Sequence, residues 1–284
     1  MSQVRIVTDG DAQLEPDLIR KLDITVVPLT VQLGNQVFPN EDGTHNEQLL
    51  LRMAADRVRP AIIGPTVADF QRIYQQLTRT TGCVFSIHSS ARLSPIYRHA
   101  RAAAEAFLGR CDIIVIDSQS TSLGLGILAR EAAIKAQAGC ALGEIVRHVR
   151  GLIPRIYVAM FTDSLDYLER SGHISRSQCI LGTMLDIKPF LAIEEGEIIP
   201  MEKVRSREKG LDKLAEFAGE FTSIEEMAIL QSTSYPTDET LLLRERLAIF
   251  FPQQSFPLMV YGPVLASHLG PDGLGLVTYE GLGG

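Results

Sequence analysis

The chain has no tryptophan, and aromatic residues make up only 6% of its 284 positions. Positive charge is also scarce, because 27 lysines and arginines stand against 34 acidic residues and the net charge is −7 at pH 7. A nucleic-acid-binding surface needs a clustered basic face, and the sequence contains no such cluster. We therefore expect no nucleic-acid partner.

Long apolar runs are missing as well. No segment approaches the roughly 18 apolar residues of a membrane span. The first residues, Met1 to Val7, lack a basic region followed by a long apolar core, so they indicate a strand rather than a signal peptide. We expect a cytoplasmic protein without stable membrane insertion.

The cysteines are few and scattered. Cys83, Cys111, Cys140 and Cys179 form no CxxC pair and have no histidine at metal-ligand spacing. They predict reduced, buried thiols and no metal site. The pair Gly124-x-Gly126 is too short for the dinucleotide fingerprint, and no Walker-type loop is present, so no cofactor is expected.

The sequence patterns predict two domains of the α/β class, at residues 1–152 and 153–284. In the first, short β-branched runs alternate with helical patterns, which predicts a mostly parallel sheet. The expected strands are 4–8, 24–31, 84–88 and 112–116, and the expected helices are 14–22, 46–57, 66–78, 94–108 and 121–137. The turn-prone stretch 34–43 predicts a small hairpin or flap.

The second half predicts an α+β domain with a mixed or antiparallel sheet. Glu194-Glu195-Gly196 is typical of a hairpin turn between strands 186–193 and 197–203. The other expected strands are 155–161, 226–232, 255–260, 263–267 and 274–279, and the expected helices are 206–221 and 237–250.

Two stretches combine glycine, hydroxyl groups and charge. Residues 113–126 indicate a buried strand that breaks at Asp117-Ser118, crosses a hydroxyl-rich turn and enters a helix through small glycines. Residues 261–271 form the second stretch. A loop at the carboxyl end of a strand is where α/β proteins place ligands.

With these stretches, further short motifs occur in a fixed order along nearly the whole chain. They are Val7-Thr8-Asp9, Val27-Pro28-Leu29-Thr30-Val31, Leu93-Ser94 with Tyr97, Asp166-Tyr167-Leu168-Glu169-Arg170, Ile187-Lys188-Pro189, Lys203-Val204-Arg205 and His268-Leu269-Gly270-Pro271. In this combination the chain resembles the DegV family, two-domain bacterial proteins whose characterised members bind a long-chain fatty acid.

The resemblance implies a non-catalytic carrier of a fatty acid such as palmitate or oleate. In that family the acyl tail lies in a tunnel, which we expect in the C-terminal domain. The carboxylate is held by hydroxyls and backbone amides at a helix start, between the two domains. A separate kinase subunit phosphorylates the presented carboxyl group, so a fatty-acid kinase is the expected partner.

Ser94 matches the family's ligand-binding serine, although a serine before Pro95 is equally typical of a helix N-cap. The resemblance also exposes departures. Pro95 and Ile96 stand where the family has glycine and threonine, and Ile62 replaces a threonine that holds the carboxylate. These changes remove hydrogen-bond donors from the expected site.

Arg205 and His268 match family residues near the head group and are the expected replacements for the lost donors. A surface arginine and a structural loop histidine are the alternatives. Ser90, with Ser89, and Thr66 are further candidate donors, unless they satisfy turn backbone.

His173 stands where the family has an arginine that helps to dock the kinase. Burying about fourteen methylenes at roughly 0.8 kcal/mol each outweighs one hydrogen bond of about 1 kcal/mol, so the tail dominates affinity.

Other functions stay open. Asp9 and Asp117 end predicted parallel strands, and with His268 they could form the site of a hydrolase or phosphotransferase facing a wet cleft. The chain could also bind a different apolar ligand, or be an interaction protein with a filled core.

Overall fold

The computed structural model describes residues 4–40, 45–56 and 58–281. It separates into two compact units. The first unit contains the described residues up to His45 and residues Ala61–Pro154, and the second contains Asn46–Pro60 and the chain from Arg155 onward. The division at 152/153 stays a prediction about domains. The units differ from it because the segment 46–60, with helix α2 (Asn46–Asp56), packs in the second unit.

A parallel four-stranded sheet forms the centre of the first unit, in the order β2-β1-β6-β7. Its strands are β1 (Arg5–Asp9), β2 (Ile24–Val27), β6 (Cys83–His88) and β7 (Asp112–Asp117). The predicted strand 24–31 is in fact two, because Pro28 has no N–H for a ladder and separates β2 from β3 (Leu29–Leu33). The prediction of a parallel sheet is confirmed.

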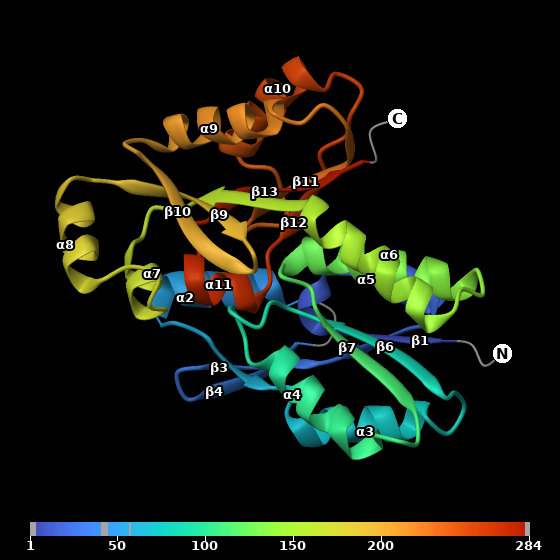
Figure 1. The fold of residues 1–284 in the computed structure, drawn as a ribbon. Coiled ribbons are helices and arrows are strands. Elements are labelled where there is room, and N and C mark those ends of the chain that lie inside the picture. Colours follow the sequence, from blue (N-terminus) through green and yellow to red (C-terminus); the bar gives the residue numbers. More distant parts are fainter. Residues whose placement is uncertain (1–3, 41–44, 57, 282–284) are drawn as a thin grey trace. The chain divides into compact units, whose positions relative to one another are not determined.

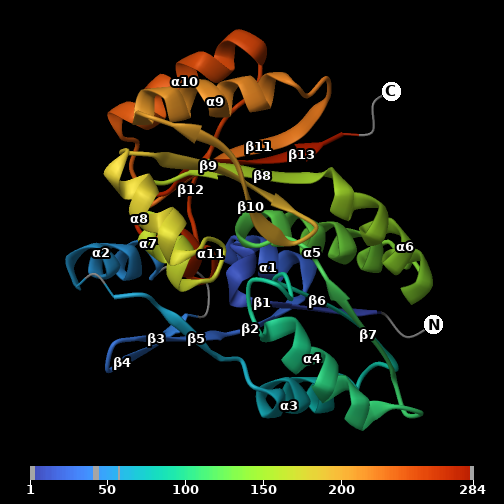
Figure 2. The same ribbon diagram turned by 60° about the vertical axis from the view of Figure 1, so that its left-hand side comes forward.

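Helices cover both faces of this sheet (Figure 1, Figure 2). On one side lie α3 (Val67–Leu77) and α4 (Ile96–Ala104), and on the other α1 (Pro16–Leu22), α5 (Ser122–Gln137) and α6 (Leu142–Leu152). Short 3-10 turns η1 (Gly10–Ala12) and η2 (Glu105–Phe107) also belong to this unit, and η3 (Ile153–Arg155) spans the point where the chain passes to the second unit. Helix α6 was not predicted, although Leu142, Ile145, Val146 and Val149 are buried at helical spacing.

A small antiparallel sheet of order β4-β3-β5 also belongs to the first unit. Strands β3 and β4 (Gln36–Asn40) form the predicted hairpin, with Gly34 at φ 59° in the turn. Residues 41–43 of the predicted stretch lie outside the described residues. The third strand, β5 (Ala61–Gly64), was not predicted.

A mixed six-stranded sheet forms the centre of the second unit, in the order β10-β9-β8-β13-β11-β12. Its strands are β8 (Ile156–Phe161), β9 (Lys188–Glu194), β10 (Glu197–Val204), β11 (Ile224–Gln231), β12 (Leu258–Val260) and β13 (Leu274–Glu280). Among the described residues of this sheet, β11 and β12 form a parallel pair and the other neighbouring strands pair antiparallel. The predicted hairpin is confirmed, with Glu195 and Gly196 both at positive φ, as its tight turn requires.

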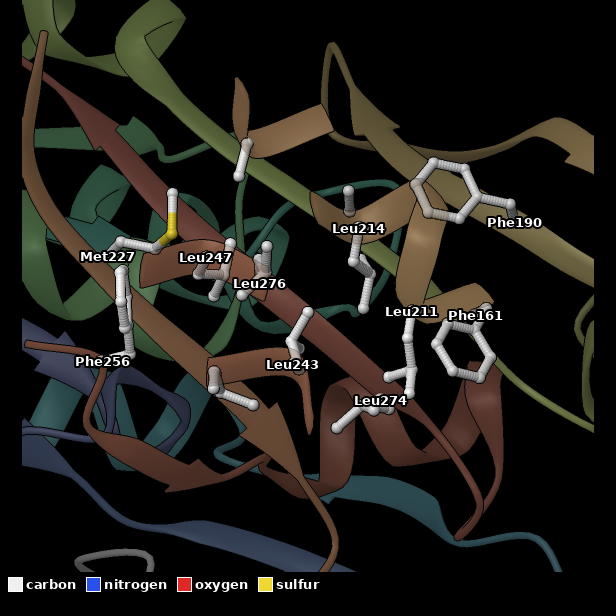
Figure 3. Packing of buried hydrophobic residues seen from close by; sticks show 13 residues of the cluster. Phe161, Phe190, Leu211, Leu214, Met227, Leu243, Leu247, Phe256, Leu274 and Leu276 are labelled. Carbon is white, nitrogen blue, oxygen red and sulfur yellow. The ribbon is translucent and has the colours of Figure 1, made fainter. Parts of the chain in front are cut away.

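Helices α9 (Arg207–Gly219) and α10 (Asp238–Phe250) pack on one face of this sheet, and α2, α7 (Asp166–Arg170) and α11 (Pro263–Leu269) lie on the other (Figure 1). Helix α8 (Arg176–Met184) follows α7. Under α9 and α10, Phe161, Phe190, Leu214, Leu243 and their neighbours form a closely packed apolar cluster (Figure 3).

The predicted strand 263–267 is wrong, because these residues form helix α11. Gly262 is extended and Pro263 occupies the first helical turn, where its missing N–H has no cost. The β-branched and apolar residues that suggested a strand are all buried in the helix, so their apolar run reflects burial on every side.

The four cysteines are free. Only Cys179 is buried, whereas the other three are partly exposed, so the prediction that all are buried is wrong. Cys83 is the first residue of β6, Cys111 directly precedes β7, and Cys140 lies between α5 and α6. Side chains at such element ends reach solvent.

Candidate functional site

A tight turn at residues 90–94 connects β6 to α4 in the first unit. The Leu93 and Ser94 N–H groups both donate to the Ser90 carbonyl at 3.0 Å. The Ser90 N–H in turn donates to the Ser120 carbonyl at 2.8 Å. The turn is thereby attached to the hydroxyl-rich loop after β7, at the carboxyl edge of the parallel sheet.

Ser94 does not cap α4. The helix begins at Ile96, and the first helical carbonyl is that of Pro95, which accepts from the His99 N–H at 3.0 Å. No side chain makes a cap hydrogen bond at this end. A residue before proline is disfavoured in the α region, and the Ser94 N–H is already held by the turn, so the cap interpretation of Ser94 is wrong.

Two serine hydroxyls in these connected loops are buried and have no partner. Ser94 is 5% exposed and Ser120 is 2% exposed. The Oγ atoms of both make no hydrogen bond to any part of the chain that the structure describes. A buried polar group left without a partner costs about 1–3 kcal/mol. Ser120 was not singled out from the sequence, although the hydroxyl-rich turn contained the signal.

The other candidate hydroxyls are engaged. Ser89 Oγ donates to Asp9 Oδ1 at 3.0 Å and to Asp11 Oδ2 at 3.1 Å. Thr66 caps α3 in a reciprocal capping box with Asp69. Ser90 Oγ accepts from the backbone of the turn, at 3.2 Å from the Arg92 N–H. These groups satisfy backbone and carboxylates, as the alternative interpretation of them expected.

Ile62 lies in β5, where it pairs with Val31 of β3. The segment that follows β5 reaches α4, because His99 Nδ1 is 2.8 Å from the Pro65 carbonyl. This hydrogen bond joins the segment after β5 to helix α4 within the first unit. The Ile62 side chain supplies no donor there.

Asp9 is the centre of a fully buried network. Its Oδ2 lies 3.1 Å from His88 Nδ1 and accepts from the Ser89 N–H at 3.1 Å. His88 Nε2 is 2.7 Å from Ser86 Oγ, which is 2.8 Å from the Tyr74 hydroxyl. The order Ser86–His88–Asp9 matches a hydrolytic triad, but all three side chains have 0% exposure. Solvent and substrate therefore do not reach this serine.

Asp11 is the second carboxylate of this network. Burial first, and then the nearby Asp9, raise its pKa to about 6, while hydrogen bonds from Thr121, Ser122 and Ser89 lower it. Its Oδ2 accepts from the Ser122 N–H at 3.0 Å and from the Thr121 hydroxyl. Asp11 connects η1 to the start of α5.

Asp117 also accepts hydrogen bonds from backbone N–H groups. Its Oδ1 accepts from the Gln119 N–H at 2.9 Å and from the Ala91 N–H at 3.2 Å. The hydrolase hypothesis required Asp9, Asp117 and His268 to meet at a wet cleft, whereas Asp9 is fully buried. Both aspartates have structural partners in the first unit, as aspartates at strand ends often do.

In the second unit, His268 of α11 is 5% exposed and faces His173. The His173 Nε2 and His268 Nδ1 atoms are 3.0 Å apart, and the ring planes are inclined by 58°. Burial lowers the pKa of His173, Glu197 raises it and Arg59 lowers it further. The sequence analysis noted position 173 only because a histidine stands there in place of the family's arginine. The contact between His173 and His268 was therefore not predicted.

Backbone geometry at the end of α7 positions His173. Gly172 adopts φ 85°, which glycine allows without strain. The Gly172 N–H donates to the Glu169 carbonyl, and the His173 N–H donates to the Leu168 carbonyl at 2.9 Å. This pair of bonds is a Schellman motif, which ends the helix and fixes the direction of the following residue.

Arg59 links the segments that carry the two histidines. Its Nε donates to the Ser267 carbonyl at 2.8 Å, and its Nη1 donates to the Arg170 carbonyl at 2.9 Å. Burial, and then Arg170, lower the pKa of the Arg59 guanidinium. A sequence pattern could not identify Arg59, since its partners are backbone carbonyls more than a hundred residues away.

Arg205 is exposed in the bend between β10 and α9, and its side chain makes no hydrogen bond or ion pair with the described residues. Arg207 is the arginine with a structural role. It makes a two-point contact with Glu239, at 2.6 and 2.7 Å, and a 2.9 Å contact with Asp163. Within the described ranges no hydrogen bond or ion pair joins Arg205 to His268.

Two negative findings apply to the residues that the structure describes. No group of three or more His, Cys, Asp or Glu side chains there is arranged to hold a metal ion. Among the same residues, no helix has the length and apolar character needed to cross a membrane.

Comparison with known proteins places the chain in a family. A sequence model described as uncharacterised protein, DegV family, matches residues 3–281. A DegV domain-containing protein of Streptomyces coelicolor is 31% identical over 278 residues, which cover 97% of this chain and 98% of that protein.

Solved structures agree with that match. A DegV family protein from Thermus thermophilus, described as fatty-acid binding, superposes with a TM-score of 0.83 at 28% identity, covering 98% of this chain and 99% of that one. The fold is shared with a DegV family protein of Streptococcus agalactiae, with a TM-score of 0.86 at 24% identity over 99% of this chain and all of that one. The chain therefore belongs to the DegV family.

Proposed function

We propose that this protein binds a long-chain fatty acid, such as palmitate or oleate, and that it is a carrier rather than a catalyst. The Thermus thermophilus relative is described as fatty-acid binding, and this chain shares its fold along nearly its whole length. The observation that carries the proposal is the Ser94 hydroxyl, which is buried, has no partner in the described chain and stands at the family's ligand-binding position.

A carboxylate oxygen would satisfy this hydroxyl. A hydroxyl donor to a charged acceptor contributes about 1.5–3 kcal/mol, more than a neutral hydrogen bond. Ser120 Oγ, on the loop bonded to the same turn, is a second hydroxyl in the same condition. Together they offset the donors that Ile62, Pro95 and Ile96 do not supply.

Arg205 and His268 are the proposed carboxylate partners from the second unit. Arg205 is exposed, and no ion pair to another described residue competes for its guanidinium. A guanidinium can donate two parallel hydrogen bonds to a carboxylate. His268 is buried and held by His173, so its ring direction is fixed before a ligand arrives. Ser90 supports the turn that presents Ser94.

We assign the acyl tail to the second unit. Side chains alternate across strands, so the neighbours of the cluster under α9 and α10 lie on the opposite face of the sheet. Met160, Leu191, Leu230 and Val277 are at these alternate positions, and each is at most 1% exposed. They are packed against other side chains in the ligand-free protein, so these contacts would have to open when the acyl chain binds. Burial of that chain contributes about 0.8 kcal/mol for each methylene.

The resemblance adds a partner to this proposal. We propose that the bound acid is presented in the cytoplasm to the catalytic subunit of a fatty-acid kinase, which phosphorylates the carboxyl group. Supplying the loaded protein, ATP and a bacterial fatty-acid kinase subunit should yield acyl phosphate. If the loaded protein gave no acyl phosphate, the proposed kinase partner would be contradicted, whereas the proposed fatty-acid carrier function would not.

The carrier itself is tested by denaturing extraction of freshly purified protein and mass spectrometry of the organic phase. The wild type is expected to yield about one fatty acid for each chain, and Arg205→Ala/His268→Ala much less. Arg147→Ala, an exposed arginine on α6, is the control and should retain the wild-type amount. A wild type without lipid, whose thermal stability does not change on adding palmitate or oleate, would contradict the proposal.

A further inference from the structure

A cleft of about 600 Å³ lies in the first unit and is lined by none of the residues assigned to the fatty acid. One wall is the end of α3, where Gln71, Gln75 and Thr78 share a face because they are four and three residues apart. The other wall is the segment from η2 to β7, which contributes Phe107 and Arg110. The volume is that of a small-molecule site.

Two arginines give this cleft its charge. Arg79 and Arg110 both line it, and both are exposed. Neither side chain makes an ion pair or a hydrogen bond with any residue that the structure describes. Among the described residues that line the cleft, none is acidic. Two positive charges without a counterion therefore share one concave surface, in a chain whose net charge is −7.

The backbone is fixed at both arginines. The Arg79 N–H donates to the Gln76 carbonyl at 3.4 Å, and the Arg110 N–H donates to the Phe107 carbonyl at 3.0 Å. Gly109 adopts φ 75°, which glycine allows without strain, and the chain turns there between η2 and β7. Ordered turns thus carry both guanidinium groups, which lowers the ordering cost of binding.

The end of α3 would oppose an anion if its carbonyls were free, because a helix C-terminus carries partial negative charge. Here the last carbonyls accept hydrogen bonds. The Tyr74 carbonyl accepts from the Thr78 N–H at 2.9 Å and from the Thr78 hydroxyl at 2.8 Å. The Leu77 carbonyl accepts from the N–H groups of Thr80 and Thr81 and from the Thr80 hydroxyl. These bonds reduce the negative field of the helix end, so the arginines determine the charge of the cleft.

The other lining groups suit the organic part of a ligand. Phe107 offers an aromatic surface, and its ring packs against Tyr74 with the centroids 6.0 Å apart and the planes inclined by 88°. The side-chain amides of Gln71 and Gln75 are exposed and form no hydrogen bond in the described chain. Each amide offers donors and an acceptor, which match the polar edge of a heterocyclic ring.

We propose that this cleft binds a small organic phosphate that carries a heterocyclic ring, as a nucleoside monophosphate does. Arg79 and Arg110 hold the phosphate, which guanidinium groups recognise through paired hydrogen bonds. Phe107 and the glutamine amides hold the ring. Inorganic phosphate would leave most of the cleft unfilled, and an uncharged ring would leave both positive charges unpaired. This binding is separate from that of the fatty acid and does not depend on it.

Cys111 makes occupancy of the cleft measurable. Its thiol is free, partly exposed and lines the cleft, so a bound ligand should slow its alkylation by N-ethylmaleimide. Cys140, between α5 and α6, is also free and partly exposed and serves as the internal reference. Delipidated full-length protein is alkylated with and without AMP, and mass spectrometry of its peptides gives the rate at each cysteine. Millimolar AMP should slow alkylation of Cys111 severalfold and leave that of Cys140 unchanged.

The arginines are tested with Arg79→Gln/Arg110→Gln, which keeps polar side chains and removes both charges. The ratio of the Cys111 rates with and without AMP is compared, since the charges also affect the thiol itself. Equal protection should need at least about tenfold more AMP in this variant. Arg147→Gln, on α6, is the matched control and should be protected like the wild type. Both variants should bind oleate with wild-type affinity, which also shows that they are folded.

Inorganic phosphate and adenosine are tested in parallel. If millimolar AMP did not protect Cys111 in the wild type, the proposed site would be overturned. Equal protection in the wild type and in Arg79→Gln/Arg110→Gln would overturn the role of the arginines. Protection by inorganic phosphate as strong as that by AMP would overturn the organic ligand class, and equal protection by adenosine would overturn the phosphate. A wild type that binds no oleate, with Cys111 protected by AMP, would overturn the proposed fatty-acid function alone.

Discussion

Replacing Ser94 by alanine is expected to affect ligand affinity and stability in opposite directions. The Ser94 hydroxyl is buried and unpartnered in the described chain, so the ligand-free protein gains nothing from it. Its removal should leave the free energy of unfolding unchanged or raise it by up to about 1 kcal/mol, because a desolvated polar group disappears. Loss of a hydrogen bond to the carboxylate should cost about 1.5–3 kcal/mol of binding, or about 10- to 150-fold in the dissociation constant.

Ser118→Ala is the matched control. Ser118 is 1% exposed, but its Oγ donates to the Ser120 carbonyl at 3.0 Å and accepts from the Ser120 N–H at 3.1 Å. Alanine there leaves a buried N–H without a partner, which should lower the free energy of unfolding by about 1–3 kcal/mol. Two buried serines in connected loops should thus give opposite results.

Both effects are measured on delipidated protein, since bound fatty acid would itself stabilise the folded state. Urea unfolding gives the stability, and titration with oleate gives the affinity. If Ser94→Ala were as destabilised as Ser118→Ala and bound oleate like the wild type, the Ser94 hydroxyl would be satisfied within the protein. The assignment of Ser94 to the ligand would then be refuted.

Three further predictions concern stability. Burial and a neighbouring carboxylate raise the pKa of Asp11 to about 6 from 3.8, so its stabilising contribution is complete below pH 3.8 and is lost as pH rises through 6. Asp11→Asn should therefore change the slope of unfolding free energy against pH in this window by up to about 1.4 kcal/mol per unit, and an unchanged slope would contradict the raised pKa. Gly126→Ala should destabilise by about 1–3 kcal/mol, because a Cβ there would overlap a backbone carbonyl of η1, whereas Gly143→Ala, with open space around it, should stabilise by about 0.5–1 kcal/mol. In chemical unfolding, the free energy of unfolding of Arg205→Ala should stay within about 0.5 kcal/mol of the wild-type value. That of Arg207→Ala should fall by about 1–3 kcal/mol, because its contacts with two carboxylates are lost. Equal losses in the two variants would contradict the different roles of these arginines.

The sequence by itself determined the features that depend on neighbouring residues. Alternation of strand and helix patterns predicted the parallel sheet, because the period of apolar residues follows from local backbone geometry. The hairpin at Glu195-Gly196 was predictable for the same reason, since its turn needs two residues at positive φ. Motif order along the chain was enough to indicate the DegV family.

Only the tertiary structure decided which candidate side chains have partners. Ser89, Ser94 and Thr66 are all hydroxyl residues at element ends, yet only Ser94 is left without a hydrogen bond in the described chain. Arg205 and Arg207 are two positions apart, yet carboxylates distant in the sequence form hydrogen bonds and ion pairs with Arg207 and not with Arg205 in the described chain. No local pattern encodes these differences.

The same holds for the helix at 263–269 and for the histidine pair. The apolar run 263–267 fits a strand or a buried helix equally well, and packing on all sides of α11 decided for the helix. His173 and His268 are 95 residues apart, and their contact exists because a Schellman motif and Arg59 bring two segments together. Sequence sets local conformation, whereas the choice of partners depends on which distant groups the fold brings within hydrogen-bonding distance.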